Sequence, residues 1–377
     1  MRASIVFANA CTMSRILSDT NRALLAGERH LGRGGMAAAL ATALLIVAAL
    51  YVTPSFTPLY HGLSYLRISR APFDFGTESA LRFRMLGPLI GYVTGLRGLA
   101  FVFVPLAFLA LFVAAAYLTY RGRDYPPIDA LAMTSLLVFS GTAFIPLISP
   151  GYTDPLSYFF VFLAFAFPQR MLLCAACFAL ALLNHESNLV LLPALVLLVA
   201  SRREAGWRSY VFAAVCLGAA TLPLWITRYV VAQHVDVLYT ADYYLNRSRI
   251  LENLRNILPL IPLGAFLAFK LFWYFPAHVL MHSSSTEHRL LIGAIVGGVT
   301  MQLGVAVDVT RLFVLAFPAV LIGAERCRAK WGTLRFRRFT WRLVGYNFLI
   351  LQYHMTAGGI DPLLPAPLVY LWRIVAG

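Results

Sequence analysis

The chain has 377 residues, of which 60% are hydrophobic and 12% are charged, and its formal net charge is +15. A soluble domain carries about 25% charged residues, so this composition excludes an ordinary water-soluble globular protein. Apolar stretches long enough to cross about 30 Å of hydrocarbon recur along the whole chain. The sequence therefore predicts an all-α fold, a polytopic transmembrane bundle of about 11 helices with some short or broken helices.

Eleven apolar segments of the chain are the expected membrane spans. A long connection with a short apolar piece at 85–96 follows the first span and forms the first loop outside the cytoplasm. Three apolar runs between 156 and 200 are shorter than a full crossing, so they either extend through their polar ends or sit within the protein. The expected spans cover residues 36–54, 98–120, 128–149, 156–167, 171–183, 189–200, 210–232, 257–281, 290–307, 312–324 and 343–355.

The positive charge does not indicate nucleic acid as a partner. Nearly all basic residues are arginines in short links between apolar segments, which is the pattern of cytoplasmic loops in membrane proteins. We therefore expect a multi-pass protein of the inner (plasma) membrane, with 1–35 as a cytoplasmic N-terminal tail and 36–377 as one transmembrane domain. Lys270 lies within an apolar segment, where we expect its side chain to snorkel toward the membrane surface.

Acidic residues from four separate connections fall on the same side of the membrane in this topology. An ionisable residue near the hydrocarbon costs roughly 2.5 to 3.5 kcal/mol, so it is rarely kept there without a partner or a task. We therefore expect the four connections to build one shared site. The acidic residues of this site are Asp74 and Glu78, Asp154, Glu186 and Asp308.

The first loop combines carboxylates with arginines. Asp74 and Glu78 are four residues apart and share a face if the segment is helical, and Arg82 continues that face. A carboxylate suits a general base, and the guanidinium groups of Arg82 and Arg84 suit a phosphate. The alternative is an interfacial helix with surface salt bridges.

Three later turns carry the remaining candidates, and each has a structural alternative. Asp154 precedes a proline and equally suits a helix cap. His185 and Glu186 interrupt an apolar stretch, and an adjacent His–Glu pair alone is a weak metal signal. Asp308 and Arg311 form either a local ion pair between two helix ends or a contact to an anionic headgroup.

These motifs together resemble a family. The first-loop segment RFRMLGPL (82–89) is similar to a Tyr-Arg-x-Leu-x-Pro stretch in bacterial membrane glycosyltransferases of the C-type fold. The segment GYTDPL (151–156), the polar turn at His185 and Glu186, and Asp308-x-x-Arg311 before an apolar helix also resemble that family. The resemblance covers roughly residues 36 to 325. The first loop lacks an Asp-x-Asp or Asp-Asp pair, and there is no large soluble C-terminal domain.

The resemblance implies transfer of a sugar from a polyprenyl-phosphate donor to a glycan or lipid acceptor on the extracytoplasmic side, by a single displacement that inverts the anomeric carbon. In such enzymes an acidic residue of the first loop commonly acts as the base, so Asp74 would be the base with Glu78 beside it. Arg82 or Arg84, together with Arg311, would hold the phosphate. The expected partners are therefore the lipid-linked sugar, its acceptor and membrane lipids.

The residues assign no cofactor and no metal site, and a divalent cation stays an alternative. Two other functions also stay open: a lipid or solute transporter or flippase, and a non-catalytic subunit of an envelope-assembly complex. As catalytic candidates the sequence gives Asp74, Glu78, Asp154 and Glu186, and as substrate-binding candidates Arg82, Arg84, His185, Asp308 and Arg311.

Overall fold

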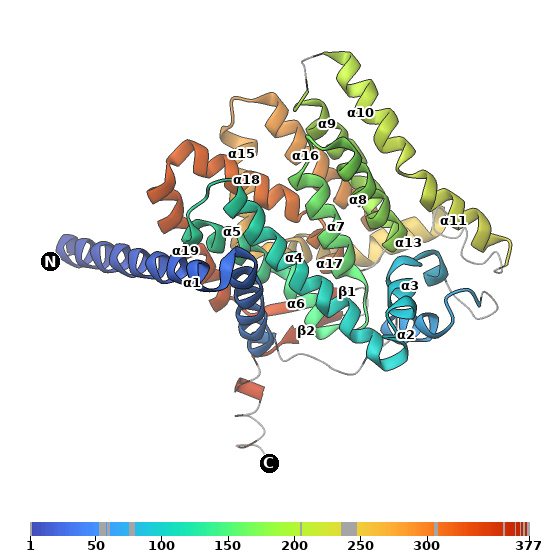
Figure 1. Cartoon of the computed structure of the whole chain (residues 1–377), viewed down its shortest axis with the longest axis horizontal. Helices are drawn as coiled ribbons and strands as arrows, with labels where there is room; N and C mark the ends of the chain where they lie inside the picture. Colours follow the sequence, from blue (N-terminus) through green and yellow to red (C-terminus); the bar gives the residue numbers. More distant parts are fainter. Residues whose placement is uncertain are drawn as a thin grey trace.

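The computed structural model is an all-α structure, and its residues are 84% helical. It describes residues 2–52, 58, 61–74, 80–203, 206–234, 247–304, 308–356, 359–365, 367–369, 371 and 374. The elements of the first half (Figure 1) are α1 (Arg2–Val52), α2 (His61–Arg70), the 3-10 helix η1 (Ala80–Phe83), α3 (Leu86–Val93), η2 (Gly98–Val102), α4 (Phe103–Gly122), α5 (Pro127–Val138), α6 (Gly141–Ile148), α7 (Asp154–Ala166), α8 (Met171–Asn184), η3 (Glu186–Leu191) and α9 (Leu192–Ala200).

The second half continues the bundle and ends in a small hairpin. Its two antiparallel strands pair with Gln352 opposite Leu363. The elements are α10 (Trp207–Ala219), α11 (Leu222–Ala232), α13 (Arg247–Ile257), η5 (Leu258–Leu260), α14 (Ile261–Phe269), η6 (Lys270–Trp273), α15 (Tyr274–His282), α16 (Thr286–Met301), η7 (Gln302–Gly304), α17 (Val309–Val314), α18 (Phe317–Trp331), α19 (Thr333–Leu349), β1 (Gln352–Thr356) and β2 (Gly359–Leu363).

Four helical segments of the described chain are long and apolar enough to cross a membrane. They are Arg15–Val52, Gly98–Gly122, Trp207–Ala232 and Ile250–His282, and the bent pair α5 and α6 makes a fifth if it counts as one span. The expected total of about 11 spans is therefore not confirmed. Helices α7, α8 and η3–α9 are the short apolar runs that the sequence predicted, and the expected span at 343–355 is instead the end of α19 followed by β1.

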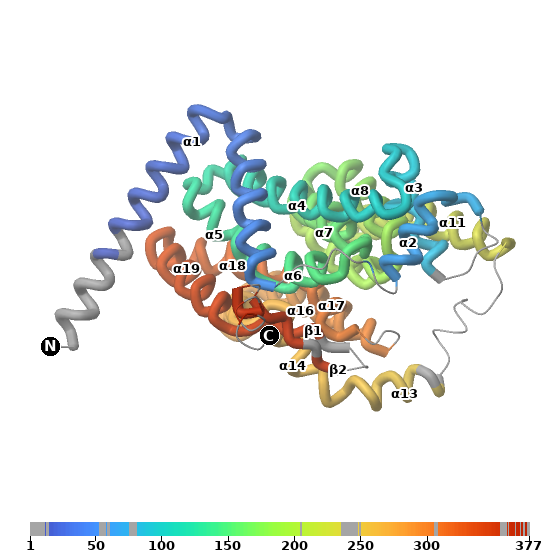
Figure 2. The backbone as a smooth tube through the Cα atoms, turned by 90° about the horizontal axis from the view of Figure 1, so that it is seen from below, coloured from blue at the N-terminus to red at the C-terminus, as the bar shows by residue number. Residues whose placement is uncertain are grey.

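The N-terminal segment is helical and belongs to the longest helix of the fold. α1 is interrupted only at Gly32, whose φ of 68° is outside the helical range. Figure 2 shows α1 turning sharply, so that its first part leaves the bundle. The Glu28 carboxylate accepts hydrogen bonds from Arg121 at 2.6 Å and from the Tyr117 hydroxyl at 2.8 Å, which fixes this turn to α4. The segment expected to be a separate tail is thus tied to the bundle.

The fifth candidate span is broken in its middle because a serine competes with the helical backbone. Ser140 is the N-cap of α6 and accepts a hydrogen bond from the backbone N–H of Thr142. Its hydroxyl donates to the carbonyl of Leu137, so the end of α5 is also satisfied. The two helices meet at 49°.

A second break, between α14 and α15, depends on two buried polar residues. Lys270 is 1% exposed, has a φ of 50°, and donates from Nζ to the backbone carbonyls of Asn347 and Ile350. The Asn347 side chain accepts from the N–H of Leu271 and donates to the carbonyl of Phe269. Broken helices are tolerated at membrane depth when other groups satisfy the freed backbone in this way. The expectation that Lys270 snorkels is therefore wrong.

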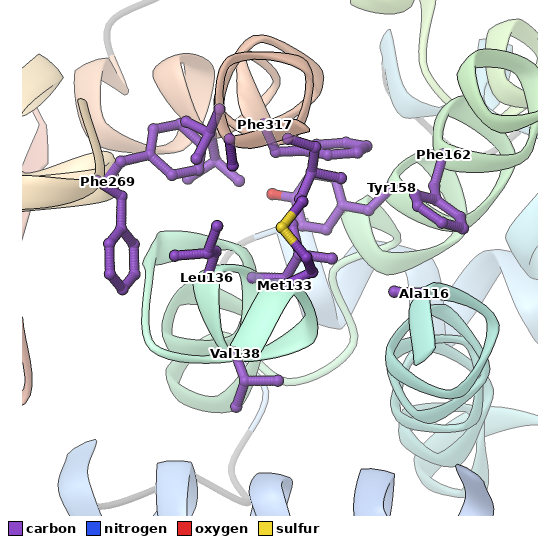
Figure 3. Packing of buried hydrophobic residues seen from close by; sticks show 14 of the residues in the cluster. Ala116, Met133, Leu136, Val138, Tyr158, Phe162, Phe269 and Phe317 are labelled. Carbon is purple, nitrogen blue, oxygen red and sulfur yellow. The ribbon is translucent and has the colours of Figure 1, made fainter. Parts of the chain in front are cut away.

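The core lies where α4, α5, α7 and α18 meet. Figure 3 shows Met133 of α5, Tyr158 of α7 and Phe317 of α18 gathered there. The rings of Tyr158 and Phe317 are 6.2 Å apart and nearly perpendicular, and Phe112 of α4 lies 5.3 Å from Phe317. This aromatic packing fixes the position of α7, whose first residue carries one of the candidate carboxylates.

The contact of α16 with η3 gives a test of this packing, because two adjacent glycines of α16 have opposite surroundings. A Cβ on Gly298 would lie 2.5 Å from the carbonyl oxygen of Val190, whereas a Cβ on Gly297 meets nothing within 4 Å. We expect Gly298→Ala to destabilise the fold by about 1–3 kcal/mol, and Gly297→Ala to be neutral or stabilising by up to about 1 kcal/mol. Unfolding of the purified variants in detergent micelles measures both values. Equal effects of the two substitutions would contradict this helix contact.

Candidate functional site

Charged side chains from distant parts of the sequence meet at one end of the bundle. They come from the segment before α3, the start of α7, the turn between α8 and η3, α11, the start of α17 and β1. We call this set the polar network. It consists of Arg84, Asp154, His185, Glu186, Arg228, Asp308, Arg311 and His354, with Tyr65 and Tyr152 packed against it.

The first pair of the polar network joins residues 102 positions apart. Arg84 donates from Nε to Oε2 of Glu186 at 3.0 Å and from Nη2 to Oε1 at 2.8 Å, a bidentate arrangement. The Tyr65 hydroxyl lies 3.4 Å from Nη1 of Arg84. Burial raises the pKa of Glu186, but the charge and hydrogen bonds of Arg84 outweigh it and hold that pKa well below its usual range. Glu186 is therefore a permanent anion and a weak base.

A second arginine approaches the same carboxylate from α11. Nη2 of Arg228 lies 3.8 Å from Oε1 of Glu186, and its guanidinium stacks 5.0 Å from the ring centre of Phe83. Arg228 forms no hydrogen bond with another residue that the structure describes. Glu186 is thus shared between two guanidinium groups.

The second pair of the polar network joins α17 to α7. Nε of Arg311 donates to both carboxylate oxygens of Asp154, at 3.0 and 2.9 Å. The guanidinium lies over the ring of Tyr152, 4.6 Å from its centre. Because only Nε is engaged, the two terminal amino groups of Arg311 form no hydrogen bond with any other described residue. Asp154 is therefore an ion-pair partner at the first turn of α7, and Thr153 holds the cap position.

Asp308 performs two tasks with one oxygen. Its Oδ1 accepts the backbone N–H of Arg311 at 3.2 Å, which caps α17, and lies 3.0 Å from Nε2 of His354 in β1. Of the two alternatives for Asp308 and Arg311, the local ion pair is replaced by a backbone cap, because the arginine side chain pairs with Asp154. Oδ2 of Asp308 forms no hydrogen bond to the described residues.

His185 lies between the two ion pairs as a neutral ring. Burial lowers the pKa of His185 to about 3, the charge of Arg84 acts in the same direction, and the charge of Glu186 opposes both. Its Nδ1 faces the backbone N–H of Ser187 at 3.2 Å and the Ser187 hydroxyl at 2.7 Å, so the ring caps η3 as an acceptor. Protonation of this nitrogen would remove the cap.

Three buried amides hold the turn that carries His185 and Glu186. Asn184 donates to the carbonyl of Thr153 and to the hydroxyl of Ser157, both at 2.8 Å, which joins α8 to α7. Asn188 donates to the same hydroxyl and to the carbonyl of His185. Gln302 of η7 donates to the carbonyl of Ser187 at 2.7 Å. The turn is thus fixed from three sides.

Six of the nine candidates from the sequence lie in the polar network, two do not, and one lies outside the described residues. Arg82 is 2% exposed and donates to the carbonyls of Ala71 and Pro72, so it supports the backbone of the first loop. Asp74 is exposed after a turn, and its charge acts on Arg82. Glu78 lies outside the described residues. Asp74 itself is not helical and follows a turn.

The sequence reasoning missed four contributors. Arg228 is embedded in an apolar helix and was counted as part of a span, although a lone arginine near the end of a span is itself a signal of function. His354 was assigned to a span that is a strand in the structure. Tyr65 and Tyr152 give no signal in the sequence, since tyrosines are common near membrane surfaces.

Among the residues that the structure describes, no group of three or more His, Cys, Asp or Glu side chains is arranged to hold a metal ion. The carboxylates of Asp154 and Glu186 are each engaged by an arginine, whose positive charge opposes a nearby cation.

The pKa of His185 predicts an acid sensitivity. The unfolded chain binds a proton at this residue below about pH 6.5 and the folded chain only below about pH 3, so stability should fall as pH falls between these values. His185→Asn keeps a cap acceptor and removes the titration. We expect the stability of the wild type relative to this variant to fall by about 1.4 kcal/mol per pH unit between pH 6 and 4. Unfolding of both proteins in mixed micelles measures this difference in stability. If the stabilities of the wild type and the variant changed in parallel with pH, a buried neutral His185 would be contradicted.

Comparison with known proteins does not place this site in a family. No protein-family model, no curated protein and no solved structure matches the chain. The function of the polar network is therefore inferred from its own geometry and chemistry.

Proposed function

We propose that the chain is a membrane glycosyltransferase that moves a sugar from a polyprenyl-phosphate donor to a hydroxyl acceptor at the polar network. The observation that carries the proposal is the state of two arginines. Among the described residues the Arg311 side chain donates through Nε alone, and Arg228 forms no hydrogen bond to any of them. Their terminal amino groups are the donors that match phosphate oxygens.

The acidic partners give these arginines a fixed direction. The Asp154 carboxylate accepts hydrogen bonds from Nε of Arg311, and the Tyr152 ring packs against the face of the Arg311 guanidinium. An arginine held in this way presents its amino groups without losing further side-chain freedom on binding, which strengthens the binding of a phosphate. Because Asp154 is paired with Arg311, Asp154 is not the best candidate for the base that accepts the hydroxyl proton.

Asp308 is the carboxylate best suited to accept a proton. Glu186 and Asp154 each receive two hydrogen bonds from an arginine side chain, which lowers their basicity. Asp308 has one oxygen engaged by His354 and a backbone N–H, and its other oxygen is not engaged by a described residue. The geometry thus favours Asp308, whereas the resemblance to the C-type glycosyltransferases favours Asp74.

The proposed step is one displacement. The acceptor hydroxyl oxygen attacks the anomeric carbon, the bond from that carbon to the phosphate oxygen breaks, and polyprenyl phosphate leaves with the electron pair. The hydroxyl proton passes to the carboxylate, and Arg311 and Arg228 stabilise the charge on the leaving phosphate. The attack inverts the anomeric carbon. The step needs no cofactor, because the glycosyl phosphate bond is already activated.

The topology assigned from the arginine distribution completes the proposal. In this topology the protein lies in the inner membrane with its N-terminus in the cytoplasm. The polar network then lies at the extracytoplasmic face, where lipid-linked sugars and glycan or lipid acceptors meet. The apolar helices α7 and α8 that border the network suit a prenyl chain. A transporter or a non-catalytic subunit would use the same residues differently, and both are outcomes of the test below.

The test offers the purified full chain radiolabelled polyprenyl-phosphate sugars and hydroxyl acceptors. Asp308→Asn keeps the cap on α17 and should lower kcat by about 10²- to 10⁴-fold, as expected for loss of a general base. Arg311→Lys should lower kcat/KM by about 10- to 100-fold, since a lysine cannot bind Asp154 and present two further N–H donors to a phosphate at the same time. Arg255→Gln, an exposed change on α13, is the matched control and should leave both constants unchanged.

The outcomes separate the assignments. If Asp74→Asn abolishes turnover and Asp308→Asn does not, the transferase stands and its base is the one implied by the resemblance. Full turnover in Arg311→Lys would remove that residue from phosphate binding. Absence of transfer with every donor would contradict the enzyme. Counterflow uptake in proteoliposomes would then favour a transporter, and its absence would favour a non-catalytic subunit.

A further inference from the structure

A cleft lies at the other end of α7, away from the polar network. Its volume is about 460 Å³, and it is lined by the ends of α4, α7, α9, α16 and α18. α7 begins at Asp154 in the polar network and ends at Ala166 in this cleft, so the two sites are separated by its 13 residues, or roughly 20 Å of helix. The cleft shares no residue with the polar network.

The cleft has two chemically different sides. One is apolar and belongs to the core: Phe162, Phe165, Leu198, Leu291, Phe317 and Leu321 line it. The other carries Arg123, Arg202 and Arg326 with a single carboxylate, Glu325. Three positive charges and one negative charge leave an excess of two.

The carboxylate is already used by one of the arginines. Arg123 donates from Nη1 to Glu325 at 2.7 Å and from Nη2 to the carbonyl of Ala166 at 2.6 Å. Arg202 and Arg326 form neither a hydrogen bond nor an ion pair within 4 Å with another residue that the structure describes, although Glu325 and Glu287 attract Arg326 from farther away. Burial lowers the pKa of Arg326, and the charge of Arg202 adds to this effect. The two guanidinium groups thus repel each other at the rim of an apolar wall.

From this geometry we propose that the cleft binds an anionic membrane lipid, with the phosphate of its headgroup between Arg202 and Arg326 and its hydrocarbon chain along the apolar wall. A phosphate relieves the repulsion between the two arginines and accepts hydrogen bonds from both. A free phosphate would satisfy the arginines as well, but it leaves the apolar wall unused. Basic residues at the end of apolar helices are the usual means by which membrane proteins hold anionic headgroups.

The site is independent of the proposed transferase activity. In the topology assigned from the arginine distribution it lies at the cytoplasmic face, where anionic lipids gather. The headgroup would join Arg202 at the end of α9 to Arg326 in α18, which lie 124 positions apart in the chain (326 minus 202). Such a lipid would therefore stabilise the packing between these helices.

The test measures binding of dioctanoyl phosphatidic acid to the full chain in a nonionic detergent. Inorganic phosphate and dioctanoyl phosphatidylcholine are the comparison probes. We expect Arg202→Gln to weaken phosphatidic acid binding about fivefold, and Arg202→Gln with Arg326→Gln to weaken it about 25-fold. Arg208→Gln removes a neighbouring exposed arginine that does not line the cleft, and it should leave binding unchanged.

Three results would overturn the proposal. Wild-type affinity in the double variant would remove the two arginines from the site. A loss in Arg208→Gln as large as in Arg202→Gln would mean that net surface charge, not the cleft, attracts the lipid. Displacement of phosphatidic acid by an equal concentration of inorganic phosphate would show a free-anion site in which the apolar wall has no part. Arg202 is exposed, so its single variant tests the site even if the double variant folds poorly.

Discussion

Burial of charge inside an apolar bundle is the constraint on which the rest of this structure depends. Arg84, Glu186, Asp154 and Arg311 are all largely removed from water, with side chains 10–27% exposed. An isolated charge in such a place is strongly unfavourable, and it is tolerated when an opposite charge and further hydrogen bonds accompany it. Each ion pair therefore fixes two distant segments of chain: Arg84 holds the segment before α3 on the turn before η3, and Arg311 holds α17 on the start of α7.

The buried polar side chains at the helix breaks follow from the same constraint. Broken helices free backbone groups, and Ser140, Lys270 and Asn347 satisfy them at two separate breaks. At the polar network Asn184 and Asn188 do the same for the turn between α8 and η3. The result is a rigid platform on which Arg228 and Arg311 keep unused donors. Rigid presentation of such donors is the physical basis of the proposed catalysis.

The sequence predicted the helical membrane fold, and it predicted a site at one end of the bundle. Both predictions rest on the length of the apolar segments and on the distribution of charged residues, which depend on local sequence alone. It placed Asp154, Glu186 and Arg311 correctly at helix ends, but not their partners. Pairing is decided by tertiary packing. An ion pair between Asp308 and the Arg311 side chain was one of two alternatives, yet the three-residue spacing suits a backbone cap. His354 was missed because the end of α19 and β1 form one apolar run, which the sequence analysis assigned to a membrane span.

The most direct measurement is a double-mutant cycle on Arg84 and Glu186, with Arg84→Met, Glu186→Gln and the double variant unfolded in mixed micelles. Removing either partner leaves the other charge buried, so we predict a coupling energy of about 2–5 kcal/mol. The exposed pair Arg22 and Asp19, which is 2.6 Å apart, is the control and should couple by less than about 1 kcal/mol. Additive effects of the Arg84 and Glu186 substitutions, within about 0.5 kcal/mol, would contradict a network held together by buried ion pairs.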